Sequence, residues 1–312
     1  GTKLGDFTTG SWTNFQNENF QLVSINTARF DVTKHRATPI ISDAKIGLQE
    51  LSSVLGDWRA PNEWYERAVS ERKKWDAYVE KESGPTNQEL PSYAHAVGAV
   101  YRNADSSDIV VTAAGGLVGE VVQIWKPKEI NTFETEWGFS CMGYEISGAL
   151  GIKMAKPDQD VVVFIGDGSY LLHNSDIYSS IMYDKKLIII LCDNGGHMVI
   201  NRLQLAKGGK EYLCNLREAR AKNVYLVDFE AHAKSMGANA ETVTSTSELE
   251  AAFLRAKKSD KTYVISIKTH GYEWLEGTAF WESPTLEVHN TEGNKKAYED
   301  HIGGKEKQRK GV

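Results

Sequence analysis

The sequence predicts an α/β protein built on a doubly wound parallel sheet. Two short apolar runs, residues 160–165 and 187–192, are continuous, rich in β-branched residues and bounded by glycine. Such runs are typical of strands that are buried on both faces of a parallel sheet. The segment between them, residues 170–186, is long enough for the helical crossover that parallel strands need. Strands and helices also alternate through the second half of the chain, as in doubly wound folds.

Composition excludes several classes of protein. The 312 residues are 41% hydrophobic and 25% charged, with a formal net charge of -6, which is ordinary for a globular protein of about two domains. There is no basic stripe and no apolar run of roughly 20 residues, so we expect neither a nucleic-acid partner nor a membrane span. The three cysteines have no CxxC spacing, which argues against zinc and disulfides and favours a reduced, cytoplasmic protein.

The first 58 residues contain two predicted strands, at 20–25 and 39–41. Ser42 and Asp43 are good N-cap residues, and they precede a predicted helix with Leu48, Leu51 and Leu55 on one face. One helix cannot cover both faces of a parallel sheet. We therefore expect residues 1–58 to be the carboxyl half of a Rossmann-like domain whose first half is missing.

Residues 59–90 are predicted to be a helical linker. The stretch 61–82 is charged and amphipathic, and its aromatic stripe is more typical of packing than of a cofactor site. Ser83, Gly84 and Pro85 end this helix.

From residue 91 the chain alternates between predicted helices and strands. The helices are at 92–102, 143–155, 228–236 and 247–257, and the strands outside the central pair are at 109–112, 131–133 and 263–267. Residues 201–224 show no clear pattern and are interpreted as a lid or a surface loop. The tail, residues 291–312, is rich in Lys, Glu and Gly and is predicted to be solvated or disordered.

Two loops at the carboxyl ends of the central strands contain polar residues that could bind a ligand. Asp167 lies between two glycines after the first strand, and Asn194 follows the second. Ligands of open α/β sheets bind at this edge, and a carboxylate with an amide oxygen suits Mg²⁺ and a bound diphosphate. Each loop alone could equally be a turn that ends a strand. His173 and His197 lie nearby in sequence and are candidates for proton transfer.

Three motifs in register carry a family resemblance. Residues 166–168 (GDG) are followed by Asn194, 27 residues after Asp167, while residues 142–144 (MGY) and 112–116 (TAAGG) lie upstream. Together they resemble the thiamine-diphosphate motifs of the acetolactate synthase and pyruvate oxidase superfamily. The resemblance implies that residues 91–290 bind thiamine diphosphate and Mg²⁺.

The resemblance also implies roles for individual residues. Asp167, the Asn194 side chain and the Gly196 carbonyl would bind Mg²⁺, and Met142 would support the two cofactor rings. The Ser140 carbonyl would accept a hydrogen bond from the amino group of the cofactor. The remaining cofactor-binding residues that it implies lie in the loops around the diphosphate: Gly115, Gly116, Leu117, Gly166, Gly168 and Ser169.

A finer resemblance points to one branch of this superfamily. Residues 136–145 (EWGFSCMGYE), 166–170 (GDGSY), 201–204 (NRLQ) and 6–9 (DFTT) are similar to the trihydroxycyclohexanedione hydrolases of inositol catabolism. The match covers nearly the whole chain, as the carboxyl half of such an enzyme. Glu145 stands where decarboxylating relatives usually have glycine, whereas His197 departs from the aromatic residue expected at its position.

The resemblance implies the ring-opening hydrolysis of a cyclic polyol diketone to 5-deoxyglucuronic acid in myo-inositol degradation. The complete enzyme would be a homodimer or homotetramer. Its activating glutamate would lie on a pyrimidine-binding domain outside this chain, so we expect the chain alone to be inactive. Candidates to face the substrate are Glu136, Glu145 and His197. The alternatives are a 2-oxoacid lyase or synthase of the acetolactate synthase type, and a non-catalytic cofactor-binding or assembly module.

Overall fold

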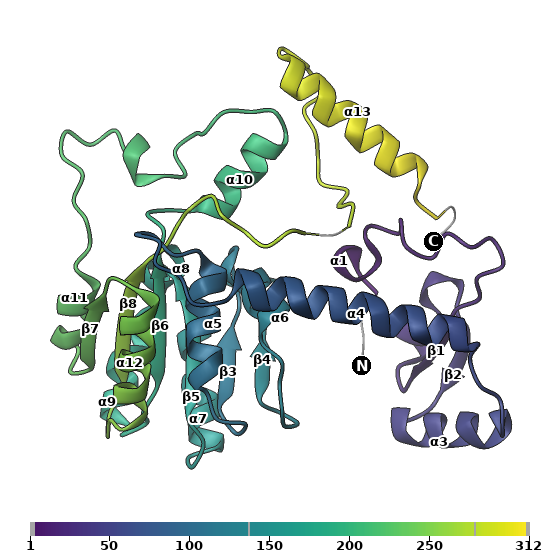
Figure 1. Cartoon of the computed structure of the whole chain (residues 1–312), viewed down its shortest axis with the longest axis horizontal. Helices are drawn as coiled ribbons and strands as arrows, with labels where there is room; N and C mark the ends of the chain where they lie inside the picture. The colour runs from purple at the N-terminus through teal and green to yellow at the C-terminus, as the bar shows by residue number, and fades with distance from the viewer. Residues whose placement is uncertain (1–3, 137, 278, 310–312) are drawn as a thin grey trace. The chain divides into compact units, whose positions relative to one another are not determined.

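The apolar runs of the second half form one parallel sheet (Figure 1). The computed structural model describes residues 4–136, 138–277 and 279–309, and within them the sheet has six strands in the order β4-β3-β5-β6-β8-β7. Their bounds are β3 Ile109–Thr112, β4 Phe133–Thr135, β5 Val161–Gly166, β6 Ile188–Asp193, β7 Asn239–Val243 and β8 Tyr263–Lys268. The central strands β5 and β6 pair with Val162 opposite Ile188.

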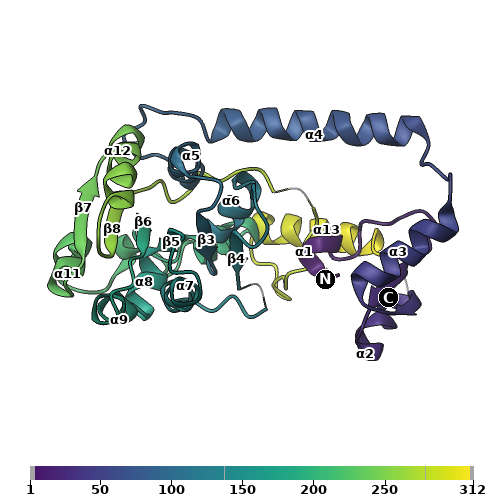
Figure 2. The ribbon, with the colours of Figure 1, turned by 90° about the horizontal axis from the view of Figure 1, so that it is seen from below.

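Helices cover both faces of this sheet, as Figure 2 shows. One face carries α5 (Tyr93–Asn103), α6 (Leu117–Ile124) and α12 (Thr246–Lys257). The opposite face carries α7 (Tyr144–Ala155), α8 (Asp167–Leu172), α9 (Asp176–Met182) and α11 (Phe229–Ser235). Each face has its own buried apolar core, because successive strand residues point to opposite sides. The arrangement confirms the predicted doubly wound fold.

The chain divides into two compact units. Unit 1 comprises Gly1–Arg72, Ala206–Gly209 and Gly277–Val312, and unit 2 comprises Lys73–Leu205 and Lys210–Glu276. The long helix α4, Asn62–Glu82, contributes residues to both. This division differs from the sequence-based boundaries, because residues 277–290 and the tail belong to unit 1.

Unit 2 contains elements that the sequence pattern did not reveal. Strand β7 is an edge strand, and its partly exposed polar residues hide the apolar signal. Asp167 begins helix α8 rather than lying in a free loop, with Gly166 as its N-cap. The stretch 201–224 is preceded and partly filled by α10 (Met198–Ala206), and a short 3₁₀ helix, η2, spans Leu216–Glu218.

Unit 1 contains a two-stranded parallel sheet of β1 (Val23–Asn26) and β2 (Thr38–Ile41). The Asp43 side chain caps α3 (Ala44–Leu55) by accepting hydrogen bonds from the N–H groups of Lys45 and Ile46. The other short elements of this unit are α1 (Asp6–Thr9), α2 (Arg29–Val32) and η1 (Lys34–Arg36).

The tail was predicted to be solvated or disordered, and for the described residues disorder is wrong, because Glu292–Glu306 form helix α13, whose residues are mostly exposed. Thr291 caps this helix by accepting from the Asn294 N–H, and the Asn294 side chain donates to the Lys207 carbonyl. Residues 310–312 of the predicted tail lie outside the described part of the chain. Within that part, no helix is both long enough and apolar enough to cross a bilayer.

Candidate cofactor site

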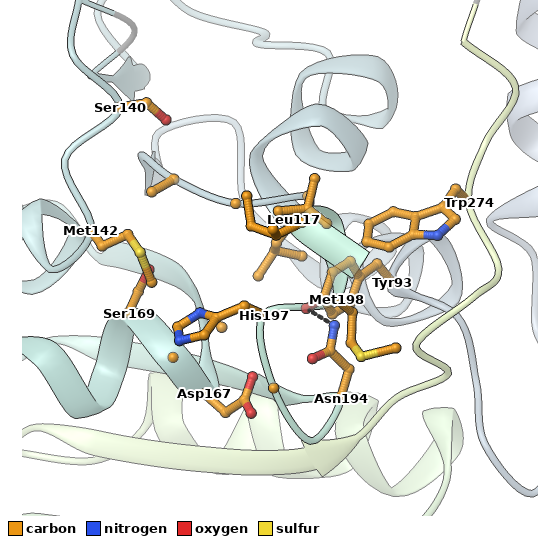
Figure 3. Close-up of a pocket in the computed structure, with 18 residues that line it drawn as sticks. Tyr93, Leu117, Ser140, Met142, Asp167, Ser169, Asn194, His197, Met198 and Trp274 are labelled. Atoms are coloured by element: carbon orange, nitrogen blue, oxygen red, sulfur yellow. Dashed lines mark hydrogen bonds between the residues drawn. The ribbon is translucent and has the colours of Figure 1, made fainter. Parts of the chain in front are cut away.

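A cavity of about 300 Å³ lies in unit 2 at the carboxyl ends of the strands (Figure 3). Its walls come from the start of α5 and from the segments that follow β3, β4, β5, β6 and β8, which are far apart in sequence. The structure brings together here every residue that the sequence assigned to the cofactor or the cation. These residues are Gly115, Gly116, Leu117, Ser140, Met142, Gly166, Asp167, Gly168, Ser169, Asn194 and Gly196.

Asp167 lies at the start of α8 and is 6% exposed. Burial, and secondly the nearby carboxylate of Asp193, raise the pKa of Asp167 from 3.8 to about 7. Hydrogen bonds from the backbone N–H groups of Gly168 and Gly196 act in the opposite direction. A cation beside Asp167 would favour its charged form, since an opposite charge within a few ångströms lowers the pKa of a carboxyl group.

Asn194 presents an amide oxygen that has no hydrogen-bond partner in the described part of the chain. Its Nδ2 donates a hydrogen bond to the Tyr93 hydroxyl at 2.6 Å, as Figure 3 draws. Its Oδ1 is buried and has no hydrogen-bond partner among the described residues. Because a buried polar atom normally has a partner, this oxygen is well suited to a ligand that the protein chain does not itself supply.

The backbone around Asn194 is fixed by the neighbouring loop. The Asp193 side chain accepts from the Gly195 N–H at 3.0 Å, and the His197 N–H donates to the Cys214 carbonyl at 2.7 Å. Gly196 has a φ of 149°, and a Cβ there would lie 2.3 Å from the Cys214 carbonyl oxygen. Only glycine fits this position, which leaves the Gly196 backbone at the cavity wall.

Two further glycines of the cavity lining lie against side chains. A Cβ on Gly168 would lie 2.8 Å from Cε1 of His197, and a Cβ on Gly116 would lie 2.1 Å from the Trp274 ring. Glycine at these positions makes room for the two rings and leaves the backbone of Gly116 and Gly168 at the cavity wall. Such glycine-lined turns are suited to phosphate groups, because backbone N–H groups can donate to them.

The three residues predicted to face the substrate have different positions. His197 lines the cavity, whereas Glu136 and Glu145 do not. Glu136 is partly exposed and accepts from the N–H groups of Phe139 and Cys141 at 2.8 Å each. These bonds, that of Cys141 first, lower the pKa of Glu136. His173, the other predicted candidate for proton transfer, lies outside the lining and pairs with Asp176 at 3.2 Å.

Glu145 has a structural position behind the cavity wall. It is 1% exposed and accepts from the Gly143 N–H at 2.8 Å and the Ala114 N–H at 3.2 Å. Burial raises the pKa of this carboxyl group. Glu145 thereby joins the loop after β3 to the start of α7.

Sequence reasoning missed two aromatic residues of the lining, Tyr93 and Trp274. Tyr93 is 4% exposed, and burial raises the pKa of its phenol well above the usual value. The two rings pack edge to face with centroids 5.6 Å apart, and the Arg202 guanidinium lies 5.0 Å from the Trp274 ring. Neither residue belongs to a local motif: Tyr93 lies inside the predicted helix at 92–102, and Trp274 lies in the stretch after the predicted strand at 263–267.

The residues present fit a diphosphate held through Mg²⁺. The described part of the chain has no group of three or more His, Cys, Asp or Glu side chains that could hold a metal. The available donors are instead one carboxylate, one unpartnered amide oxygen and a backbone carbonyl. Mg²⁺ is usually bound by only one or two carboxylates and takes phosphate oxygens and waters as its further ligands.

Comparison with known proteins shows the family to which the cofactor domain belongs. A family model described as the C-terminal TPP binding domain of thiamine pyrophosphate enzymes matches residues 113–267. These residues run from the loop after β3 into β8 and include most of the cavity wall. The chain therefore carries the C-terminal cofactor-binding domain of the thiamine pyrophosphate enzyme family.

Among curated proteins, the chain is similar to those named 3D-(3,5/4)-trihydroxycyclohexane-1,2-dione hydrolase. The protein of Halalkalibacterium halodurans is 32% identical over 330 aligned positions, covering 96% of this chain and 51% of that protein. The one from Lacticaseibacillus casei is 33% identical, with 96% and 50% covered. The chain thus spans about half the length of these relatives.

A solved structure shows the same fold. The thiamine diphosphate-dependent 4-hydroxybenzoylformate decarboxylase of Rhodococcus jostii RHA1 superposes with a TM-score of 0.64. The match covers 82% of this chain and 45% of the decarboxylase, at 16% identity. At that identity the likeness supports the fold alone.

Proposed function

We propose that this chain forms the cofactor-binding half of a thiamine diphosphate-dependent hydrolase of myo-inositol degradation. Its substrate would be trihydroxycyclohexane-1,2-dione, a cyclic polyol diketone. Water would be added across one carbon–carbon bond of the ring, which gives 5-deoxyglucuronic acid. We place the complete enzyme in the cytoplasm, as a homodimer or homotetramer.

The observation that carries the proposal is the gathering of eleven predicted cofactor and cation residues around one cavity. The substrate class rests on the similarity of nearly the whole chain to proteins that bear this hydrolase name. In Bacillus cereus, the protein named 3D-(3,5/4)-trihydroxycyclohexane-1,2-dione hydrolase 2 is 33% identical, with 99% of this chain and 53% of that protein covered.

Each part of the site has a proposed role. Asp167, Asn194 Oδ1 and the Gly196 carbonyl would hold Mg²⁺, while Gly168 and Ser169 would donate N–H groups to the diphosphate. Ser140 and Met142 are assigned to the ring end of the cofactor. When bound, thiamine diphosphate supplies an electron sink for breaking a carbon–carbon bond next to a carbonyl. His197 lines the same cavity and is the proposed group for proton transfer near the substrate.

The test is an assay of the full-length gene product with thiamine diphosphate and Mg²⁺. We expect it to consume the cyclic diketone and to form the ring-opened acid without releasing carbon dioxide. Carbon dioxide release from pyruvate would instead support a 2-oxoacid lyase or synthase. If cofactor binds but neither substrate reacts, the chain serves as a cofactor-binding or assembly module.

A further inference from the structure

The hydrogen bond between Tyr93 and Asn194 has a role that the cofactor motifs do not explain. We propose that Tyr93 is a positioning residue whose hydroxyl holds the Asn194 amide with Oδ1 turned toward the cation. This inference rests on the proposed function, because it concerns the cation site proposed there.

The two ends of the Asn194 amide group differ in what they can bind. A rotation of the Asn194 amide group by 180° exchanges Oδ1 and Nδ2, and only the oxygen end can bind a cation. In the structure Nδ2 donates to the Tyr93 hydroxyl at 2.6 Å, while Oδ1 is buried without a partner among the described residues. The phenol therefore satisfies the end of the amide that cannot be a ligand.

Tyr93 is itself held firmly. It is the first residue of α5, where Ser92 and His95 form a capping box: the Ser92 hydroxyl accepts from the His95 N–H at 3.3 Å, and His95 Nδ1 accepts from the Ser92 N–H at 3.1 Å. Its ring is 4% exposed and packs against Trp274. A phenol fixed in this way can determine the orientation of a neighbouring amide. Groups that orient a metal ligand in this manner typically change metal affinity by roughly 10–100-fold when they are removed.

A direct contact between Tyr93 and the cofactor is the competing role, because Tyr93 also lines the cavity. The two roles differ in their dependence on residue 194. An aspartate at that position presents an oxygen whichever way its carboxylate is turned, so it needs no orienting partner. The effect of Tyr93 should therefore disappear when Asn194 is replaced by aspartate.

The first experiment measures apparent Mg²⁺ affinity by calorimetry at saturating thiamine diphosphate. We expect Tyr93→Phe to weaken it roughly 10–100-fold, as for other outer-shell changes. Tyr101→Phe, which removes a hydroxyl from the same helix at a ring packed on Trp125, is the matched control and should leave it unchanged. Equal affinities for wild type and Tyr93→Phe would overturn the proposal.

The second experiment is a double-mutant cycle with Asn194→Asp. We expect Tyr93→Phe to change Mg²⁺ affinity less than about threefold in this background, since a coupled pair loses its interaction when either member is replaced. If Tyr93→Phe weakened Mg²⁺ affinity equally with asparagine and with aspartate at position 194, Tyr93 would act on the cofactor directly and the proposal would be wrong. If the full-length wild-type protein shows no Mg²⁺-dependent cofactor binding at all, the proposed function fails, and this inference fails with it.

A third measurement does not depend on the folding of any Tyr93 variant. In wild-type protein, the side-chain NH₂ signals of Asn194 can be assigned by NMR from their loss in Asn194→Asp. We expect these protons to exchange slowly with water, because Nδ2 is bonded to a buried phenol, and to shift when Mg²⁺ and thiamine diphosphate are added. Exchange as fast as that of an exposed asparagine would contradict the proposal.

Discussion

Glu120 is a buried carboxyl group close to the cofactor cavity. It lies on α6, is 2% exposed, and accepts from the Leu275 N–H at 3.2 and 3.3 Å with its two oxygens. Burial raises its pKa from 4.5 to about 7, and the hydrogen bond from Leu275 and the charge of Arg202 only partly oppose this. The group is therefore neutral in the folded state over a pH range in which it is charged in the unfolded chain.

This shift predicts a loss of stability with rising pH. Because the folded pKa is raised, the contribution of Glu120 is fully present below pH 4.5 and is lost as pH rises through about 7. The difference between the pKa of Glu120 in the unfolded chain and in the folded protein corresponds to roughly 3 kcal/mol in the free energy of unfolding. Glu120→Gln keeps an acceptor for Leu275 and removes the charge, so we expect it to melt several degrees higher than wild type at pH 8 and nearly equally at pH 4.

Thermal melts between pH 4 and pH 8 measure this effect. Glu250→Gln on α12 is the control, because this carboxylate is 31% exposed in its pair with Arg102. Its pH profile should follow that of wild type. A Glu120→Gln profile parallel to that of wild type would show that burial of Glu120 does not cause the pH dependence.

Among the elements, a network of ion pairs joins the segments just before β3 and β5 to the carboxyl end of α12. The Lys257 ammonium lies 2.5 Å from Asp108, 2.9 Å from Asp105 and 3.5 Å from Asp160. Asp108 is 3% exposed, and burial raises its pKa even with Lys257 beside it. Lys257 thus compensates a buried charge at the edge of the sheet opposite to the cofactor cavity.

Removing this cation should be costly. We expect Lys257→Met to destabilise the fold by about 3–5 kcal/mol, because it leaves a buried carboxylate without its partner. Lys234→Met breaks a solvent-exposed pair with Glu230 and should cost less than about 1 kcal/mol. Urea unfolding of both variants compares the two costs, and similar values for them would contradict the assigned role of Lys257.

The elements that sequence could predict are those with a strong local pattern. Strands β5 and β6 are continuous apolar runs, and the bounds predicted for them differ from the observed ones by one residue at each end. Strand β7 was missed because an edge strand needs fewer apolar residues. Helix α13 was missed because its stability depends on distant contacts, such as the hydrogen bond from Asn294 to Lys207.

The residues of the site likewise fall into those with a local sequence motif and those that only distant contacts bring into place. Asp167, Asn194 and the glycines lie in short motifs, so sequence alone grouped them, and the structure places them around one cavity. Tyr93 lies 101 residues from its partner Asn194, and no local signal connects the two. Glu145 was read as a candidate to face the substrate, but its hydrogen bonds to Ala114 and Gly143 became visible only in the folded chain.

At the scale of the whole molecule, the parallel sheet of unit 2 explains how the site forms. Parallel strands place all their carboxyl ends at one edge, so segments from Tyr93 to Trp274 meet there. We propose that this edge holds thiamine diphosphate through Mg²⁺ bound to Asp167 and Asn194.

Calorimetric titration of thiamine diphosphate into the protein, with Mg²⁺ and with EDTA, measures this binding. We expect saturable binding with Mg²⁺ and none with EDTA. Asp167→Asn should weaken binding by at least about 100-fold, because losing a ligand costs more than the roughly 10–100-fold of an outer-shell change. Asp176→Asn, on the neighbouring helix α9, should bind as wild type does. Thiamine diphosphate binding that survives EDTA, or that Asp167→Asn leaves intact, would show that Mg²⁺ at Asp167 does not hold the cofactor.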